Sequence, residues 1–526
     1  MVYLGAEPFK MPIFTPPNRP PAAIILPAPK YGTTPETIIS QGHTYIVTGN
    51  TLLPPHVITA ALSKAKTSRE AVDALLAAYR RQGYLLVAIT ARSEGQKLYV
   101  SVIEGMITDV QGHGGVRAFF KNAKERENLK KRSLIRDNIL ASSYAERSGQ
   151  TLRLNISPAS NPGGAVLDLQ QTRKDGYFPV SGGVNFGNYG SRYSSGYVYG
   201  GDVVGNLGHG IQLSTNFTKG LPGLRRISLG SVYYQVGGGG SIVTPYGIYG
   251  FDINRSHYQL GKATKPLSPA GNSLTYDFTG QQLPYASEST RWSINEGFHH
   301  VKYLETVYSY YKLLSQRYNY VSIGTNLSRG VTLGHLPGVV SGGATFNVGI
   351  SPRVGTLYDG RLGIPTSHFR YIDFNTGYNQ GLPKNFSLAF SIQGQWSAQT
   401  LPSQQQWTLG GLGNMAAWEP SVVVGDSGYV SKLEIYGPGI SRLHSQAKLG
   451  AFIETGGVTY RAATHGECPW NSLTDAGVDL TIQLPYQFSA HAMAAFPVWR
   501  RGFTQAGKRN LSVNRLDAFF VIQKGF

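Results

Sequence analysis

The chain has 526 residues, and 48 Lys and Arg against 29 Asp and Glu give it a formal net charge of +19. Hydrophobic residues make up 41% of the chain, which excludes disorder over most of its length. A membrane-spanning helix needs about 18 consecutive apolar residues, and no stretch of the chain approaches this length. Lys and Arg are scattered among Gly, Ser and Tyr, which argues against nucleic acid as a partner. The single cysteine, Cys468, excludes an intramolecular disulfide framework and a Cys-rich metal site.

Residues 1–39 are predicted to be a Pro-rich N-terminal segment that acts as a linker. Seven prolines between positions 12 and 29 keep this backbone extended and deny it helical hydrogen bonds. The segment lacks a basic stretch followed by about 7 to 15 apolar residues, so no secretory signal is visible. Because the rest of the chain favours export, we expect the printed sequence to lack its true start.

Residues 40–110 are predicted to form a small α+β domain. Thr67 and Glu70 have the spacing of a helix capping box, and apolar residues follow at helical intervals until Gly83 ends the helix. A weaker helix is expected over 56–64. Short runs at 45–47, 85–91 and 98–103 alternate as strands do, so the predicted order is strand, helix, helix, strand, strand.

Residues 111–174 are predicted to be a looser second copy of this domain. A helix with a solvated basic face is expected over 121–136, where Lys and Arg are interleaved with Glu125 and Glu127. A further helical segment over 134–142 and strands over 151–156 and 165–169 complete the copy.

From residue 175 to 526 the helical period gives way to a period of two. Runs such as 211–217, 227–233, 386–392 and 478–484 alternate apolar and polar residues, which is typical of strands with one apolar face. A soluble sandwich or propeller is disfavoured, because about 350 residues are long for one sandwich and show no blade repeat. Division by 16 gives about 22 residues per strand and connection, which suits a transmembrane β-barrel. Phe520, Ile522 and Phe526 share one face of the last strand, and this terminal aromatic looks like the insertion signal of bacterial outer-membrane barrels.

The order of these features resembles the TpsB transporters of two-partner secretion, the haemolysin secretion/activation protein family. The resemblance covers nearly the whole chain. In the first α+β domain it is carried by three motifs: the 48–50 turn with Leu53 and Pro54, Gly83–Tyr84 at the helix end, and Val102, Glu104, Gly105 and Ile107 at the strand end. In the barrel half it is carried by Asn185, Gly187, Ser191 and Leu283 to Tyr285. It implies α+β periplasmic POTRA domains over 40–110 and 111–174, followed by an all-β 16-stranded transmembrane β-barrel over 175–526. A plug helix, which this family places ahead of the POTRA domains, is not recognisable here.

The most specific part of the resemblance is a loop expected between strands 11 and 12 of the barrel. In the family this loop folds into the lumen, and its arginine contacts an acidic Phe-x-Asp-x-Gly motif on the barrel wall. The residues here that match the lumen-loop motif are Leu409, Gly410, Gly411, Met415, Ala416, Ala417, Trp418, Gly425, Asp426 and Gly428. The wall motif is Phe452, Glu454 and Gly456, with Glu in place of Asp.

Ala416 replaces the loop arginine, so the wall carboxylate loses charge-assisted hydrogen bonds worth about 1.5–3 kcal/mol unless water or another cation takes over. We therefore expect a more mobile loop, docked mainly by Trp418, with a wetter pore or weakened secretion. An alternative interpretation of Glu454 is an ordinary polar residue that faces a water-filled lumen.

Four other patterns have weaker functional interpretations. Gly425–Gly428 is similar to the nucleophile loop of trypsin-like proteases, but Tyr429 replaces a glycine and His465 follows Ser427, against that family's order. His299 and His300 are adjacent, so on a strand they point to opposite faces and cannot share a metal; interfacial or loop positions are expected for them. The glycine run 237–240 is expected to be a flexible loop or turn rather than a phosphate cradle. Cys468 is expected to lie in a loop.

The resemblance implies a passive outer-membrane pore that secretes a large exoprotein of adhesin or haemolysin type. Its POTRA domains would lie in the periplasm and capture the N-terminal secretion domain of the exoprotein by adding a strand to a sheet edge. The other expected partners are outer-membrane lipid and the barrel-assembly machinery, and the chain is expected to be monomeric, without catalytic residues, metal or cofactor. The alternatives are a solute channel or a membrane-protein assembly factor of the same superfamily, and a soluble β-rich adhesin.

Overall fold

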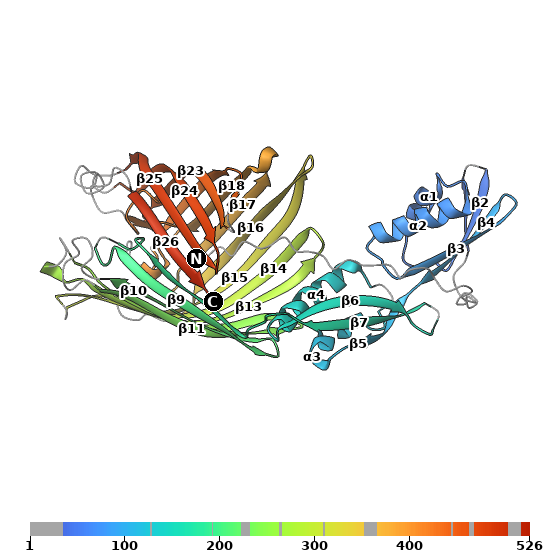
Figure 1. Cartoon of the computed structure of the whole chain (residues 1–526), viewed down its shortest axis with the longest axis horizontal. Coiled ribbons are helices and arrows are strands. Elements are labelled where there is room, and N and C mark those ends of the chain that lie inside the picture. The colour runs from blue at the N-terminus through green and yellow to red at the C-terminus, as the bar shows by residue number, and fades with distance from the viewer. Residues whose placement is uncertain are drawn as a thin grey trace.

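The computed structural model describes residues 35–40, 42–126, 129–161, 163–191, 193–221, 232–261, 266–308, 311–351, 365–442, 445–461, 468–502 and 517–526. Two α/β units, drawn in blue and teal in Figure 1, extend from one end of a large β-barrel. Within the described residues, none of the helices is both long enough and apolar enough to cross a membrane.

The first α/β unit is a four-stranded sheet covered by two helices. Strands β1 (Glu36–Ser40), β2 (His43–Thr48), β3 (Val87–Glu94) and β4 (Lys97–Glu104) are arranged in the order β1-β2-β4-β3. Helices α1 (Pro55–Leu62) and α2 (Ser68–Arg81) pack on the sheet through a core that includes Tyr45, Leu62 and Leu75. The predicted capping box is confirmed, because the Thr67 hydroxyl accepts a hydrogen bond from the Glu70 N–H at 3.2 Å.

Strand β1 was not expected from the sequence, because it begins inside the segment interpreted as a linker. It pairs antiparallel with β2 from Glu36 to Ser40, and Ile38 on its inner side joins the core. The prolines that suggested a linker end at Pro29, and the last proline ahead of β1 is Pro35, so the backbone N–H groups that follow are free to join the sheet. Residues 1–34, the rest of the predicted linker, lie outside the described residues.

The second α/β unit has three strands, β5 (Met106–Gln111), β6 (Gln150–Pro158) and β7 (Gly164–Arg173), in the order β5-β7-β6. Helix α3 (Gly114–Arg117), the 3-10 turn η1 (Ala118–Ala123) and helix α4 (Lys131–Glu146) cover it. The predicted strands over 151–156 and 165–169 are confirmed. The predicted basic helix over 121–136 is wrong: Phe119, Phe120 and Ala123 insert into the core and fix a 3-10 turn, and a single helix begins only at Lys131.

The rest of the chain forms a closed antiparallel barrel in which β26 pairs with β8. Strands β21 and β22 both pair with β23 and are one interrupted strand, so the described residues form sixteen strands, as predicted. The strands are β8 (Val180–Gly187), β9 (Tyr197–Gly208), β10 (Ile211–Leu221), β11 (Val232–Thr244), β12 (Gly247–Gln259), β13 (Ala270–Ala286), β14 (Thr290–Val307), β15 (Tyr311–Leu333), β16 (Leu336–Gly349), β17 (Arg370–Gly381), β18 (Ser387–Ser397), β21 (Ser427–Tyr436), β22 (Ile440–Arg442), β23 (Ser445–Thr459), β24 (Trp470–Leu484), β25 (Phe488–Arg501) and β26 (Asp517–Gly525).

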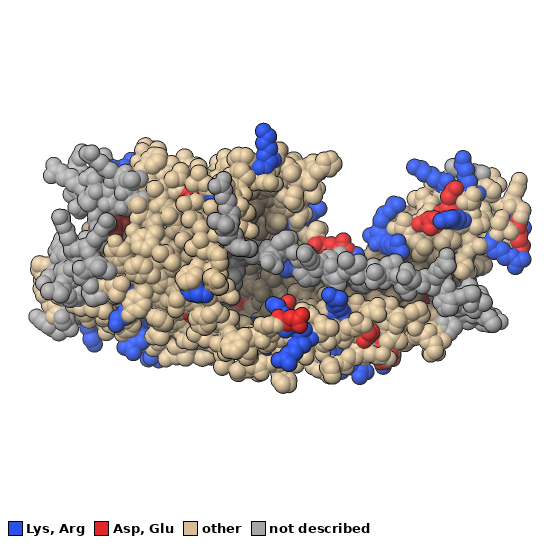
Figure 2. All heavy atoms as spheres, viewed as in Figure 1, with Lys and Arg blue, Asp and Glu red and all other residues tan. Residues whose placement is uncertain are grey.

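Side chains alternate between the inner and outer faces of this barrel. Outward residues such as Phe278 and Phe298 are exposed, whereas their neighbours Asp277 and His299 are half-buried inside. Figure 2 shows a barrel wall on which Lys, Arg, Asp and Glu are sparse. An outward apolar band around a polar interior is the pattern of a barrel that spans a membrane.

The glycine run 237–240 lies inside strand β11, so the prediction of a flexible loop is wrong. A Cβ at Gly237 would lie 2.1 Å from Asn254 Oδ1, and a Cβ at Gly239 would lie 2.1 Å from Asp252 Oδ1. Glycine is therefore used here because polar side chains of β12 occupy the inner face of β11. Of the neighbouring run predicted over 227–233, only Val232 and Tyr233 fall within the described residues.

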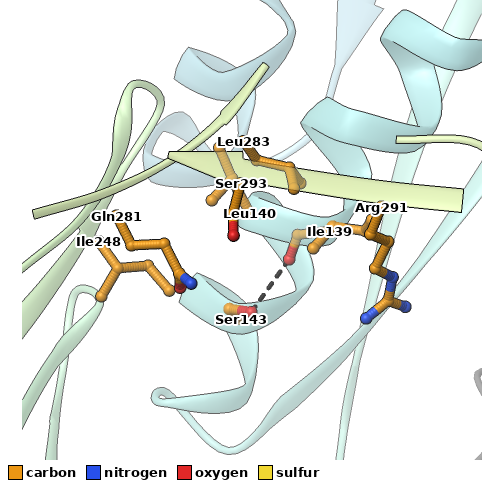
Figure 3. Close-up of a pocket in the computed structure, with 8 residues that line it drawn as sticks. All are labelled: Ile139, Leu140, Ser143, Ile248, Gln281, Leu283, Arg291 and Ser293. Atoms are coloured by element: carbon orange, nitrogen blue, oxygen red, sulfur yellow. Dashed lines mark hydrogen bonds between the residues drawn. The ribbon is translucent and has the colours of Figure 1, made fainter. Parts of the chain in front are cut away.

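Helix α4 rests against the barrel end nearest to the α/β units. The Arg147 guanidinium donates hydrogen bonds to the carbonyl oxygens of Gly210 at 2.7 Å and Ser241 at 2.9 Å, which joins the helix end to the β9–β10 turn and to strand β11. A cavity of about 180 Å³ remains between α4 and strands β12 to β14, lined on the helix side by Ile139, Leu140 and Ser143 (Figure 3).

Candidate functional site in the barrel lumen

Residues 398–426 form a loop between β18 and β21, the eleventh and twelfth barrel strands. The loop contains a 3-10 turn, η4 (Ser403–Gln405), and a small hairpin of β19 (Trp407–Leu409) and β20 (Val423–Gly425). The four residues 415–418 are at most 4% exposed and pack on Val430, Phe452, Leu473, Met493 and Ala495 of the barrel wall. Because these wall residues face the lumen, the loop folds back inside the barrel.

The tip of the loop is bonded to the wall through its backbone. The Ala416 N–H donates to Glu454 Oε2 at 2.9 Å, and the Ala417 N–H donates to Asp475 Oδ2 at 2.8 Å. Glu454 and Asp475 are direct neighbours across β23 and β24. Met415 has a φ of 68°, a left-handed conformation that is rare for this residue type and that precedes the two consecutive N–H donors. We call these two bonds the tip anchor.

A cation also reaches Glu454, but it comes from the wall rather than from the loop. Lys432, which lies opposite Glu454 across β21 and β23, places Nζ 3.3 Å from Glu454 Oε1 and 2.6 Å from Glu434 Oε1. The Lys432 ammonium also lies 4.7 Å from the centroid of the Phe452 ring. Lys432 thus supplies the positive charge that the absent loop arginine does not.

Trp418 docks on the wall as expected, but it does not hold the loop tip alone. Trp418 is buried, yet its indole N–H has no hydrogen-bond partner among the described residues, so it contributes by packing alone. The polar bonds are made by the two alanine N–H groups instead. A main-chain N–H is present whatever the side chain, which is why the anchor survives the change from arginine to alanine.

The glycines of the two motifs allow the loop to lie close to the wall. Gly410 and Gly411 have φ values of 110° and 102°, which favour glycine, and a Cβ at Gly410 would lie 2.0 Å from the Glu419 carbonyl oxygen. A Cβ at Gly428 would lie 2.1 Å from Trp407 Cδ1, and one at Gly456 would lie 3.0 Å from Leu409 Cδ2. Leu409, the last residue of β19, is itself fully buried.

Asp426 and Ser427 fasten the ends of the loop. The Asp426 carboxylate is 1% exposed and accepts hydrogen bonds from the Leu401 N–H at 2.8 Å and from the Arg461 N–H at 2.9 Å. The Ser427 hydroxyl accepts from the Ser397 N–H at 2.8 Å and donates to the Ser397 carbonyl at 3.1 Å. These bonds occupy the hydroxyl of the protease-like motif and make Ser427 a structural residue. His465 lies outside the described residues.

The base of the loop makes a second set of contacts that the sequence did not predict. The Gln405 side chain accepts a hydrogen bond from the Tyr371 hydroxyl at 2.5 Å and donates one to the Tyr318 hydroxyl at 3.1 Å. The Ser403 N–H donates to Gln316 Oε1 at 3.1 Å, and Leu401 packs in a cluster with Tyr318, Phe369 and Tyr371. We call these contacts the base latch. They hold the loop to β15 and β17, whereas the tip anchor holds it to β23 and β24.

The two histidines occupy opposite faces of β14, as predicted, but they lie within the strand rather than in a loop. His299 Nδ1 is 2.7 Å from Asp277 Oδ1, and His299 Nε2 is 3.0 Å from Ser322 Oγ. These are the distances of a catalytic triad, but the three residues lie in regular antiparallel strands. The backbone N–H groups around them pair with the neighbouring strands and therefore cannot form an oxyanion hole. His300 bonds to Asn319 on the outer face. No cluster of three or more potential metal ligands occurs within the described ranges.

The residues predicted as an insertion signal lie on the outer face at the barrel closure. Phe520 packs on Phe186 of β8 with ring centroids 5.7 Å apart, and Ile522 and Phe526 are exposed. The Phe526 backbone exchanges two hydrogen bonds with Gly182. These contacts place the residues, while their role in insertion stays a prediction. Cys468 is exposed after β23.

The sequence model of the haemolysin secretion/activation protein family ShlB/FhaC/HecB matches residues 163–467. The heme/hemopexin transporter protein HuxB of Haemophilus influenzae is 24% identical over 195 residues, which are 35% of this chain and 33% of HuxB. The match thus spans about a third of the length of that relative.

Two solved structures are similar in fold over nearly the whole chain. CdiB from Escherichia coli has a TM-score of 0.75 at 17% identity and covers 95% of this chain and 93% of its own. CdiB from Acinetobacter baumannii has a TM-score of 0.66 at 14% identity and covers 99% and 94%, respectively. The family match covers more than half of the chain, so the chain belongs to the haemolysin secretion/activation protein family ShlB/FhaC/HecB, the TpsB transporters of two-partner secretion, with its barrel in the outer membrane and its N-terminal units on the periplasmic side.

Proposed function

We propose that this chain secretes a large exoprotein of adhesin or haemolysin type across the outer membrane without the use of a cofactor or of catalysis. The observation that carries the proposal is a loop of the family's pattern, folded into the lumen of a sixteen-stranded barrel and bonded to its wall at Glu454 and Asp475. Such a loop restricts the pore at rest and leaves room for a chain when it moves.

The two α/β units span 36–104 and 106–173 rather than the predicted 40–110 and 111–174, because β1 belongs to the first sheet and β5 to the second. We propose them as POTRA domains that capture the N-terminal secretion domain of the exoprotein. Among the described residues, the edge strands are β1 and β3 in the first sheet and β5 and β6 in the second, and each leaves one side open to a further strand. Thr151, Arg153 and Asn155 alternate as exposed residues along β6. An extended segment can add to such an edge through backbone hydrogen bonds, which give affinity without demanding one sequence.

The position of α4 supports a handover from these units to the pore. The Arg147 bonds to Gly210 and Ser241 hold the second unit at the periplasmic rim of the barrel. A segment captured on β6 is therefore already close to the barrel entrance. The energy for transport would come from folding outside the cell, since the sequence holds no nucleotide-binding motif. The barrel-assembly machinery and outer-membrane lipid are the further proposed partners, and the proposed state is a monomer.

Secretion by cells tests this proposal. The protein would be expressed behind a functional signal peptide together with an exoprotein encoded beside it, and the exoprotein would be measured in the medium with and without this chain. We expect release that depends on the chain. Retention in the periplasm, with the barrel shown to be folded in the outer membrane, would contradict the proposal and favour a solute channel or an assembly factor.

A further inference from the structure

The outer face of strands β12 to β15 changes its chemistry row by row along the strands. Cross-strand register places Phe251, Phe278, Phe298 and Val321 side by side in one row. The next row on each strand, further from the α/β units, is Ile253, Tyr276, His300 and Asn319. The row after that is Arg255, Leu274, Lys302 and Arg317. We call this last set the basic row.

The three cations of the basic row are close together and unused by the protein. Arg255, Lys302 and Arg317 are all exposed, and none of them forms an ion pair or a side-chain hydrogen bond with the residues that the structure describes. Neighbouring strands are about 4.8 Å apart, so the row spans about 14 Å. Glu296, the acidic residue on the same face of β14, lies three rows nearer to the periplasmic end.

Four strands elsewhere in the barrel carry no such row. The outward residues of β18, β21, β23 and β24 include Ile392, Leu433, Ile453 and Val478, and within these strands no Lys or Arg shares their face. A lipid-facing surface gains nothing from charge by itself, and a basic residue there is costly near the midplane of the bilayer. Three such residues in one place therefore indicate an anionic ligand at the edge of the membrane.

The height of the basic row identifies the leaflet. Strand β12 starts at Gly247, next to Ile248, which lines the cavity under α4 at the periplasmic end. Arg255 follows eight residues later, and a tilted strand rises about 20 Å over that length. The row thus lies toward the outer leaflet, above the apolar rows that would contact acyl chains.

We propose that Arg255, Lys302 and Arg317 bind the phosphorylated headgroup of a glycolipid in the outer leaflet. Each of the two guanidinium groups can bind a phosphate through two N–H donors, and the lysine adds a positive charge between them. Basic pockets on membrane proteins bind lipid headgroups through the same chemistry. Tyr276 and Phe278, in the two rows below, offer apolar surface to the lipid chains. The proposal rests on the outer-membrane location alone and is independent of secretion.

The test measures lipid binding to the full chain in neutral detergent by native mass spectrometry. Three probes are compared: lipid A with both phosphates, the same lipid without phosphate, and inorganic phosphate. The variant Arg255→Gln/Lys302→Gln/Arg317→Gln is matched by Lys64→Gln/Lys66→Gln/Lys97→Gln, which removes the same charge from exposed positions of the first α/β unit. We expect the barrel variant to bind phosphorylated lipid A about 100-fold more weakly and the control to bind it as the wild type does.

Three results would overturn the proposal: equal binding of the two lipids, equal binding by the barrel variant and its control, or binding of inorganic phosphate as tight as that of lipid A. Heat-modifiable migration on gels checks that the triple variant is folded. If it is not, the single change Lys302→Gln takes its place, and about fivefold weaker binding is expected. Unchanged binding by that single variant would also count against the proposal.

Discussion

The tip and the base of the 398–426 loop are both buried on the barrel wall, but different chemistry holds them. At the tip, main-chain N–H groups of Ala416 and Ala417 bond to carboxylates of Glu454 and Asp475. At the base, side chains bond to side chains, with Gln405 between Tyr318 and Tyr371. Hydrogen bonds to a carboxylate are stronger than neutral ones, whereas only the hydrogen bonds of the base are made by a loop side chain. The comparison shows that a lost motif residue need not mean a lost contact.

The largest effect is expected at the tip. In Glu454→Ala/Asp475→Ala, two buried N–H groups lose their carboxyl acceptors, at a cost of about 1–3 kcal/mol each. We expect the loop to leave the wall and the single-channel conductance in planar bilayers to rise severalfold. The matched control is Asp252→Ala, an inward carboxylate on β12, away from the loop. Wild-type conductance in the double variant would show that the tip anchor does not hold the loop.

A second prediction concerns the arginine that this family normally carries. Ala416 is fully buried, so the larger side chain of Ala416→Arg alone should overfill the site and disturb the loop. We expect this overpacking to cost about 1–3 kcal/mol of stability. Removal of the competing cation in Ala416→Arg/Lys432→Ala should recover part of this loss, because the guanidinium then takes the place of Lys432 beside Glu454.

The measurement is a double-mutant cycle on conductance and on secretion. A coupling energy of about 1 kcal/mol or more is expected for these neighbouring sites. Strictly additive effects of Ala416→Arg and Lys432→Ala would mean that the two cations do not compete for the carboxylate.

At the base, Gln405→Ala should weaken the attachment of the loop to the wall less than the double change at the tip does. It removes two neutral hydrogen bonds, which are worth about 0.5–1.5 kcal/mol each. We expect more frequent brief openings rather than a stable open state, because the tip anchor remains. Single-channel recording separates the two behaviours. A stable open state in Gln405→Ala would reverse the ranking of tip and base.

The smallest effect is expected for Tyr371→Phe, which removes one hydroxyl from the base latch and keeps the ring in its cluster. Its control is Tyr378→Phe on the same strand, whose hydroxyl bonds to Gln380 and not to the loop. We expect opening frequency to rise slightly in Tyr371→Phe and not in Tyr378→Phe. Equal changes in both variants would indicate a general effect on β17.

Much of the architecture could be predicted because it follows from local patterns. Alternation in runs such as 478–484 predicts strands, and Thr67 with Glu70 predicts the start of α2, since both signals lie within a few residues. The same approach failed at 121–136, where burial of Phe119 and Phe120 sets the local structure, and at 237–240, where side chains of the next strand decide the use of glycine.

The sequence by itself determined a large β-barrel and two preceding α/β units, and the resemblance to the family implied its sixteen strands and the position of the lumen loop between the eleventh and twelfth. Only the tertiary structure decided how that loop is held. Lys432 lies 22 residues before Glu454, and Gln405 lies 87 residues after Tyr318, so no local pattern joins these pairs. Register across β21 and β23 brings the first pair together, and the return of the loop into the lumen brings the second. Main-chain donors such as the Ala416 N–H also carry no signal in a sequence, because every residue except proline has one.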